Sequence, residues 1–120
     1  MRSIVFSMVF ALTLAVGVSF AGDAGKGQAL FNGTGKCKVC HKTDATKLVG
    51  PGLAGTTKNN DDAFLKEWIS DSQGTWAKGG PAIEAMQKRV NKVGKPKTAM
   101  VPGKLTAEEV DDVIAYLHTL

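Results

Sequence analysis

The sequence predicts an all-α domain. Three segments carry apolar residues at helical intervals, and the last of them begins with a helix-capping signature. No segment alternates apolar and polar residues as a half-buried strand would. The chain has 120 residues, and the part after its apolar N-terminal run has the size of one domain. We therefore expect about four to five short helices in a single domain.

The N-terminal segment has the features of a cleavable export signal. Met1-Arg2 is a positive start, Ile4–Val18 is almost unbroken apolar sequence, and Ser19-Phe20-Ala21 places small residues where a signal peptidase reads them. An uncleaved membrane anchor is the alternative, but the apolar run is shorter than the roughly 20 residues that a bilayer span prefers. We expect removal of residues 1–21, export to the periplasm, and a mature domain of residues 22–120 without stable membrane insertion.

Two helices are predicted in the first half of the domain. Asp23 can cap a short helix from about Ala24 to Phe31. Val49 to Lys58 contains a proline and three glycines and reads as an ordered loop. Asn60 or Asp61 can cap the next helix, whose apolar stripe is Phe64, Leu65, Trp68 and Ile69.

An irregular connection and a third helix follow. The connection is marked by three glycines and a proline: Gly74, Gly79, Gly80 and Pro81. Ile83, Met86 and Val90 then fall at helical spacing, which predicts a helix that ends near Gly94.

The last part of the chain combines a loop with the best-signalled helix. Lys95 to Lys104 contains two prolines and a glycine around Met100, so this methionine is expected on a loop. Thr106 and Glu109 have the spacing of a capping box. The helix after them carries apolar residues at i, i+3, i+4 and i+7: Val110, Val113, Ile114 and Leu117.

The clearest chemical signal is the run Cys37-Lys38-Val39-Cys40-His41. Two thiols separated by two residues and followed at once by an imidazole are the pattern by which a c-type haem is attached. Each thiol can add to one vinyl group of the porphyrin as a thioether, and the adjacent histidine is then placed under the iron. The motif occurs once, so one covalent haem c per chain is expected.

Other uses of this motif are weaker. Both cysteines of the chain lie in it, and a disulfide between Cys37 and Cys40 would suit an exported protein but leaves His41 unexplained. A thioredoxin-like dithiol would follow a strand, and none is predicted before Cys37. A structural zinc site would need two further ligands.

An iron held by His41 needs a sixth ligand for electron transfer, and Met/His ligation is the usual arrangement in electron carriers. The mature chain offers Met86 and Met100. Met86 lies at helical spacing among apolar residues, where filling the core is the simpler interpretation. The sequence therefore favours Met100 and leaves Met86 as the alternative.

Taken together, these features resemble the class I, monohaem cytochromes c of the small bacterial type. In that family the haem motif lies near the N-terminus, a Gly-Pro-x-Leu-x-Gly segment follows, the methionine ligand comes late on a loop, and the terminal helices cross. The corresponding segments here are Cys37–His41, Gly50–Gly55, Met100 and Thr106–Leu120. The resemblance covers residues 22–120 except for about 77–94, which is longer than many small members need.

The resemblance implies a role for each residue of the site. Cys37 and Cys40 would form the thioethers, and His41 and Met100 would be the axial ligands. The backbone carbonyl of Pro51 would accept a hydrogen bond from the free ring nitrogen of His41, which would orient the imidazole and increase its donor strength. Leu53 would line the haem pocket.

Five further positions match the family. Gly27 corresponds to the small residue at the crossing of the terminal helices, with Phe31 and Tyr116 as aromatic neighbours. Trp68 resembles the aromatic residue beside the haem on the methionine side, with ordinary core packing as the alternative. Trp76 resembles a loop tryptophan whose indole N–H meets a haem propionate in some bacterial members, with a loop anchor as the alternative.

These expectations describe a soluble periplasmic carrier of one electron, a monomer rather than an enzyme, whose partners are redox proteins. Two alternatives stay open. One is a haem-carrying subunit of a larger oxidoreductase, for example in sulfur-compound oxidation. The other is a five-coordinate, gas-binding cytochrome.

The charge of the chain is modest. Its formal net charge of +4 is too small to argue for nucleic acid binding. Lysines beside the haem motif and the methionine loop can steer docking to acidic partners, although a solvated lysine surface explains them without any partner. These residues are Lys36, Lys38, Lys42, Lys95, Lys97 and Lys104.

Overall fold

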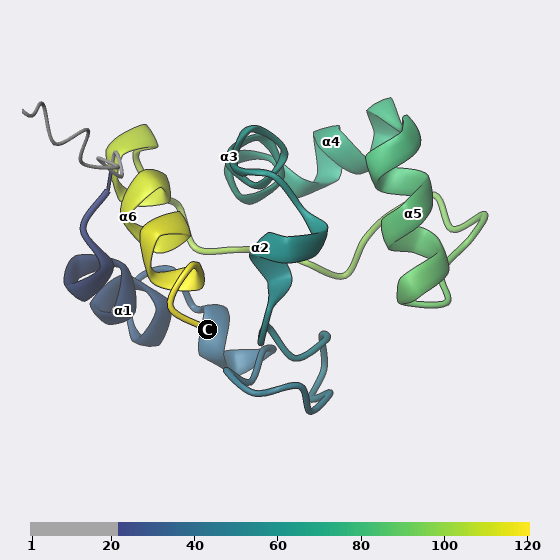
Figure 1. Ribbon diagram of the computed structural model, residues 1–120. Coiled ribbons are helices and arrows are strands. Elements are labelled where there is room, and N and C mark those ends of the chain that lie inside the picture. The colour runs from purple at the N-terminus through teal and green to yellow at the C-terminus, as the bar shows by residue number, and fades with distance from the viewer. Residues whose placement is uncertain (1–21) are drawn as a thin grey trace, which may run out of the picture.

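The computed structural model describes residues 22–120, which form six α-helices and one short 3₁₀ turn (Figure 1). The elements are α1 (Ala24–Asn32), η1 (Cys37–Val39), α2 (Thr56–Asn59), α3 (Asp62–Ser70), α4 (Ser72–Lys78), α5 (Pro81–Arg89) and α6 (Ala107–Leu117). No strand occurs in this part of the chain, so the all-α prediction is confirmed. The predicted export signal, residues 1–21, lies outside the described residues.

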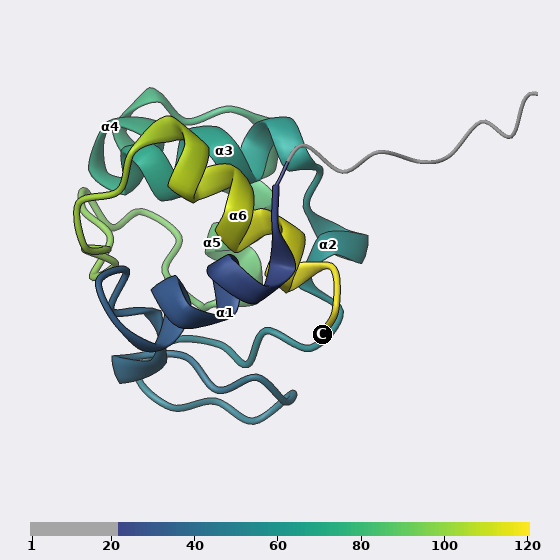
Figure 2. The same cartoon turned by 90° about the vertical axis from the view of Figure 1, so that its left-hand side faces the viewer.

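The two terminal helices pack across each other, as Figure 2 shows for α1 and α6. Gly27 lies buried at this crossing, where a Cβ would overlap the backbone carbonyl of Asp112 and lie 2.9 Å from the Cβ of Tyr116. The rings of Phe31 and Tyr116 meet edge to face with centroids 5.4 Å apart. The predicted crossing and the predicted place of Gly27 are confirmed.

A buried carboxylate also joins these helices. The Asp23 side chain caps α1 by accepting from the backbone N–H of Lys26 at 3.0 Å, as the sequence predicts. The backbone N–H of Asp23 donates to Asp112 Oδ1 on α6 at 2.8 Å. Asp112 is only 8% exposed, so a charged residue of α6 is buried in order to hold the start of α1.

The core lies between α6 and α3 and continues to α4 and α5. It consists of Phe31, Leu65, Trp68, Ile69, Trp76, Ile83, Val110, Val113, Ile114 and Leu117. The predicted apolar stripes on α3 and α6 supply members of this core, and Ile83 of the third predicted pattern also belongs to it. Asp61 is the residue that caps α3, and the predicted capping box of Thr106 and Glu109 is present at the start of α6.

Two short helices were not expected from the sequence. The segment predicted as an ordered loop ends in α2, which follows Gly55 in the left-handed region (φ 70°). The segment around Gly74 forms α4 instead of an irregular connection. Asp71 caps α4 by accepting from the N–H of Gly74 at 2.9 Å, so a favourable cap offsets the poor helix propensity of glycine. Six helices therefore replace the four to five expected.

Helix α5 is shorter than the sequence predicts, because it ends at Arg89 and not near Gly94. Asn91 adopts the left-handed conformation (φ 54°), and the N–H of Lys92 donates to the carbonyl of Gln87 at 2.8 Å. This closes the helix by satisfying one of its last carbonyls. The glycine pair before α5 has positive φ, as the predicted break requires, and Pro81 begins the helix.

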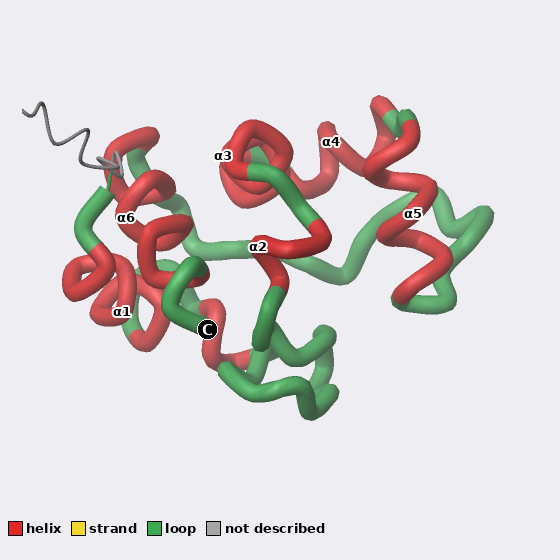
Figure 3. The backbone as a smooth tube through the Cα atoms, in the orientation of Figure 1, coloured by secondary structure: helices red, strands yellow, loops and turns green. Residues whose placement is uncertain are grey.

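The connection from α5 to α6 is a long loop, residues 90–106, that crosses the molecule back to the terminal helices (Figure 3). It contains Met100 and confirms that this methionine lies outside helices. Within residues 22–120, no helix has the length and apolar character needed to cross a membrane.

Candidate haem site

The cysteine motif lies on a tight turn that follows α1. Its 3₁₀ turn η1 comes directly after Lys36, which has a left-handed backbone (φ 57°). The N–H groups of Cys40 and His41 both donate to the carbonyl of Cys37, at 3.2 and 2.9 Å. These bonds hold the two thiols and the imidazole on one compact stretch of backbone.

The imidazole of His41 is oriented by the segment that carries Pro51. His41 Nδ1 lies 2.7 Å from the backbone carbonyl oxygen of Pro51. A carbonyl only accepts, so Nδ1 is the donor, and in this tautomer Nε2 is the nitrogen that carries no proton. The hydrogen bond that the resemblance implied is therefore present, and it leaves one nitrogen for a metal.

Gly50 makes this arrangement possible. Its N–H donates to the carbonyl of Cys40 at 2.7 Å, so the segment is bonded to the motif at two successive residues. A Cβ at Gly50 would lie 2.5 Å from Cε1 and 2.9 Å from Nδ1 of His41. Sequence reasoning placed Gly50 in a family segment but missed this steric role, for which a glycine before proline was the only signal.

Both thiols are free and half-buried. Burial raises the pKa of the Cys37 thiol, which lies 3.6 Å from the carbonyl oxygen of Gly35. The disulfide considered from the sequence is thus not formed. Within residues 22–120, no group of three or more His, Cys, Asp or Glu side chains is arranged to hold a metal ion.

The surroundings fit a large, flat, apolar cofactor. Several apolar side chains pack against the core but stay only partly buried. They include Cys37 and both candidate methionines. The full set is Leu30, Cys37, Leu53, Phe64, Met86, Met100, Leu105, Tyr116 and Leu120. A covalently held haem would cover apolar surface that a domain of this size cannot bury by itself. Two free thiols for covalent attachment, together with an imidazole Nε2 and a thioether as iron ligands, are also the groups that hold haem c.

The two methionines differ in their setting, as the sequence predicts. Met86 lies on α5, and both methionines are partly buried against the core. Met100 lies on the long loop, half-buried, and its N–H donates to Thr98 Oγ1 at 3.2 Å.

Trp76 lies on α4 and not on a loop, which corrects one expectation. It is 5% exposed, and its indole Nε1–H donates to the backbone carbonyl of Lys95 at 2.8 Å. This bond anchors the loop that contains Lys95, which is the alternative role that the sequence left open for Trp76.

Trp68 is 6% exposed and belongs to an aromatic row. Its ring is stacked on Phe64 with centroids 6.3 Å apart and lies tilted against Trp76 at 6.2 Å. These contacts show the core packing that was considered for Trp68.

Sequence reasoning assigned no role to Gln73. Its Nε2 donates to the backbone carbonyl of Thr98 at 2.7 Å and lies 3.4 Å from the carbonyl of Met100. Nothing in the sequence signals this contact, because the partners are far apart in the chain and meet only through the fold.

Comparison with known proteins agrees with the geometry. The sequence profile of the cytochrome c family matches residues 24–120. The chain belongs to the cytochrome c family. It is 32% identical over 125 residues to cytochrome c2 of Rhodospirillum rubrum, an alignment that covers 92% of this chain and 90% of that protein.

A second relative is the cytochrome c-type protein cyt cy of Rhodobacter capsulatus. It is 30% identical over 113 residues, which cover 85% of this chain and 51% of the relative, so the chain spans about half of that protein's length. As a member of this family, the chain has covalently attached haem c as its cofactor and is an electron carrier, not an enzyme. When bound, haem supplies the one-electron Fe(III)/Fe(II) couple.

Proposed function

We propose that this chain is a soluble periplasmic carrier of one electron. Four residues hold its haem. Cys37 and Cys40 form the thioethers, His41 provides the ligand on one side through Nε2, and Met100 provides the thioether ligand on the other. The observation that carries the proposal is the 2.7 Å contact between His41 Nδ1 and the carbonyl of Pro51. It leaves Nε2 as the free nitrogen of an imidazole directly beside a pair of free thiols.

The protein's part is to keep its ligands in place in both oxidation states. The Pro51 carbonyl holds the proton of His41 on Nδ1 and increases the donor strength of the other nitrogen. Because Gly50 has no Cβ, the His41 ring can lie directly against its backbone. Because the thiols, the imidazole and Pro51 are bonded through one network of backbone contacts, little has to rearrange when an electron arrives or leaves.

The thioether of Met100 would set the direction of electron flow. A soft, neutral sulfur ligand favours the reduced metal and raises the reduction potential relative to a second imidazole. A carrier with a raised potential accepts electrons from the reduced form of couples of lower potential and passes them to the oxidised form of couples of higher potential.

Haem attachment is tested on protein matured in a cell that can attach haem c. A pyridine haemochrome spectrum and the mass of the intact chain should both show one covalent haem. Replacing Cys37 and Cys40 by alanine should abolish the attachment. A wild-type chain of unmodified mass would contradict the proposal, and N-terminal sequencing of the same sample tests cleavage before Gly22.

The sixth ligand is tested by a matched pair of substitutions. Met100→Leu should abolish the weak near-infrared sulfur-to-iron band of the oxidised protein and allow rapid carbon monoxide binding to the reduced form. Met86→Leu should leave both properties unchanged, since that residue would only fill the core. The reverse result would assign Met86, and rapid carbon monoxide binding by the wild-type protein at neutral pH would favour the gas-binding alternative.

The kind of partner is tested by purification. A free carrier should be recovered alone from periplasmic extract and should exchange electrons with separate redox proteins. Stoichiometric co-purification with a catalytic subunit would favour the oxidoreductase-subunit alternative instead.

A further inference from the structure

The loop that carries Met100 has little support from its own backbone. It is residues 90–106, between α5 and α6 (Figure 3). Among the described residues, no backbone-to-backbone hydrogen bond involves residues 96–102. The N–H of Met100 bonds within the loop, to Thr98 Oγ1. The place of Met100 therefore depends on groups supplied by other elements.

Two side chains of α4 supply such groups. The indole of Trp76 donates to the carbonyl of Lys95 at 2.8 Å. The amide of Gln73 donates to the carbonyl of Thr98 at 2.7 Å and lies 3.4 Å from the carbonyl oxygen of Met100. Gln73 and Trp76 are three residues apart and so share one face of their helix. One face of α4 thus contacts the methionine loop at three backbone carbonyls, those of Lys95, Thr98 and Met100.

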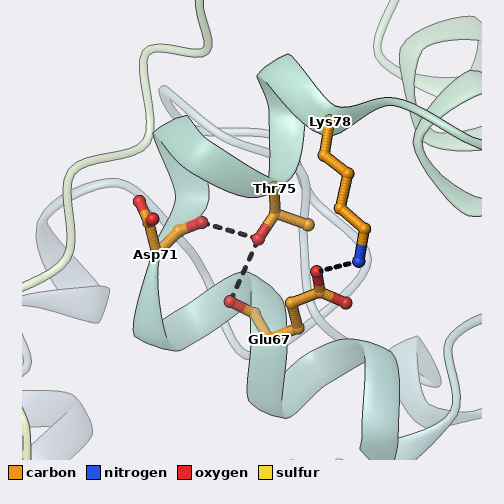
Figure 4. A network of polar contacts seen from close by, with 4 residues as sticks. All are labelled: Glu67, Asp71, Thr75 and Lys78. Atoms are coloured by element: carbon orange, nitrogen blue, oxygen red, sulfur yellow. Dashed lines mark hydrogen bonds and ion pairs between the residues drawn. The ribbon is translucent and has the colours of Figure 1, made fainter.

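Helix α4 is itself firmly attached to α3, as Figure 4 shows. Thr75 Oγ1 donates to the carbonyls of Asp71 and Glu67 at 2.6 and 3.2 Å. Lys78 Nζ lies 2.7 Å from Glu67 Oε1. The Ser72 hydroxyl adds a buried bond to the carbonyl of Trp68 at 2.7 Å. These bonds fix α4 relative to α3, so α4 can support the loop.

Packing holds the far part of the loop less well. A groove of about 360 Å³ lies between the corner that joins α3 to α4 and residues 100–105. Beyond it, the N–H of Gly103 donates to the carbonyl of Gly35 at 3.0 Å, just before the haem motif. The loop around Met100 is thus hydrogen-bonded near both ends, at Lys95 and Gly103, and borders a groove along one side. We infer that its hydrogen bonds to α4 fix the position of Met100.

We propose that Gln73 and Trp76 are positioning residues that keep the thioether of Met100 at the sixth coordination site. The inference rests on the proposed function, because it requires Met100 to be the ligand. The two hydrogen bonds are expected to contribute unequally to the position of Met100. The indole of Trp76 is buried, so its part-buried bond to the Lys95 carbonyl is less easily replaced by water, whereas Gln73 is exposed and water can replace its amide.

The test measures how readily an added ligand displaces Met100. Imidazole binds the oxidised, haem-loaded protein only when the methionine is detached, so its apparent affinity reports the detached fraction. Trp76→Phe keeps an aromatic ring in the core but removes the N–H, and should raise the affinity about tenfold. Gln73→Glu keeps the size but removes the donor, and should raise it about threefold to fivefold.

Two controls separate positioning from general destabilisation. Gln28→Glu makes the same chemical change on the exposed surface of α1, where no contact reaches the loop, and should leave the affinity unchanged. Val113→Ala opens the buried core at α6 and should lower the urea midpoint without raising the affinity.

The outcomes distinguish the two proposals. Unchanged imidazole affinity in both Gln73→Glu and Trp76→Phe, in a protein whose wild type shows the near-infrared sulfur-to-iron band, overturns the positioning role alone. A rise of the same size in Val113→Ala overturns it as well. A wild type that lacks the band overturns methionine ligation and the positioning role together. Because Gln73 is exposed, Gln73→Glu tests the role even where Trp76→Phe fails to fold.

Discussion

Replacing Gly27 by alanine should force the terminal helices apart. The added Cβ would overlap the backbone carbonyl of Asp112 and lie 2.9 Å from the Cβ of Tyr116. A backbone group cannot turn away as a flexible side chain can, so the relief has to come from separation of α1 and α6. The edge-to-face pair of Phe31 and Tyr116, with centroids at 5.4 Å, lies in the same contact and would be loosened.

The size of the effect follows from these two contributions. Overpacking a well-packed interior costs about 1–3 kcal/mol, and loss of the aromatic geometry adds about 0.5–1.5 kcal/mol. The free energy of unfolding should therefore fall by roughly 2–4 kcal/mol. With a urea slope of about 2 kcal/mol per molar, the midpoint of the haem-loaded protein should fall by about 1–2 M.

Gly25 provides the matched control on the same helix. A Cβ there would meet only the Asp23 carboxylate, at 3.3 Å, and Gly25 is exposed. Alanine is the better helix former, so Gly25→Ala should leave the midpoint unchanged or raise the unfolding free energy by up to about 1 kcal/mol. A Gly27→Ala midpoint within error of the wild type, or a larger loss in Gly25→Ala, would refute the steric argument.

Three further substitutions test other contacts. Gly50→Ala should push the His41 ring off the Pro51 carbonyl, and an exchange-protected ring N–H that persists in proton NMR of the reduced protein would contradict this. Asp112→Ala should lower the unfolding free energy by about 1–3 kcal/mol in urea melts, because the Asp23 N–H loses its buried acceptor; an unchanged midpoint would argue otherwise. Thr106→Ala should cost about 1 kcal/mol in the same assay through loss of the α6 capping box, and no loss would show that the cap is dispensable.

Local signals predicted the helices whose caps and apolar faces are formed by residues close together in the sequence. Asp23, Asp61 and Thr106 cap their helices as expected, since a cap needs only a side chain within reach of the next turn. The haem motif was equally readable, because its spacing is a local requirement of the chemistry. The order of motif, Pro51 segment and late methionine then indicated the family that the comparisons show.

The errors came where distant contacts overrode local preference. Gly74 suggested a break, yet α4 forms there because Asp71 caps it and because Thr75 and Lys78 bond it to Glu67 of α3. Trp76 was expected on a loop because it resembles a loop tryptophan of the family, yet it lies on α4. The helix that contains Met86 was predicted to end near Gly94 but ends at Arg89. No apolar pattern in the sequence marks the left-handed turn at Asn91 that follows it.

By itself, the sequence determined the all-helical class, and the order of its motifs indicated the crossing of the terminal helices and the residues proposed to attach haem. Each of these signals lies within a few positions or in the order of motifs. Only the tertiary structure decided how those groups are held. The contact of Gly50 with the His41 ring and the bond from Gln73 to the methionine loop join residues far apart in the chain. Such contacts have no local signature, because they arise only after packing has brought the segments together.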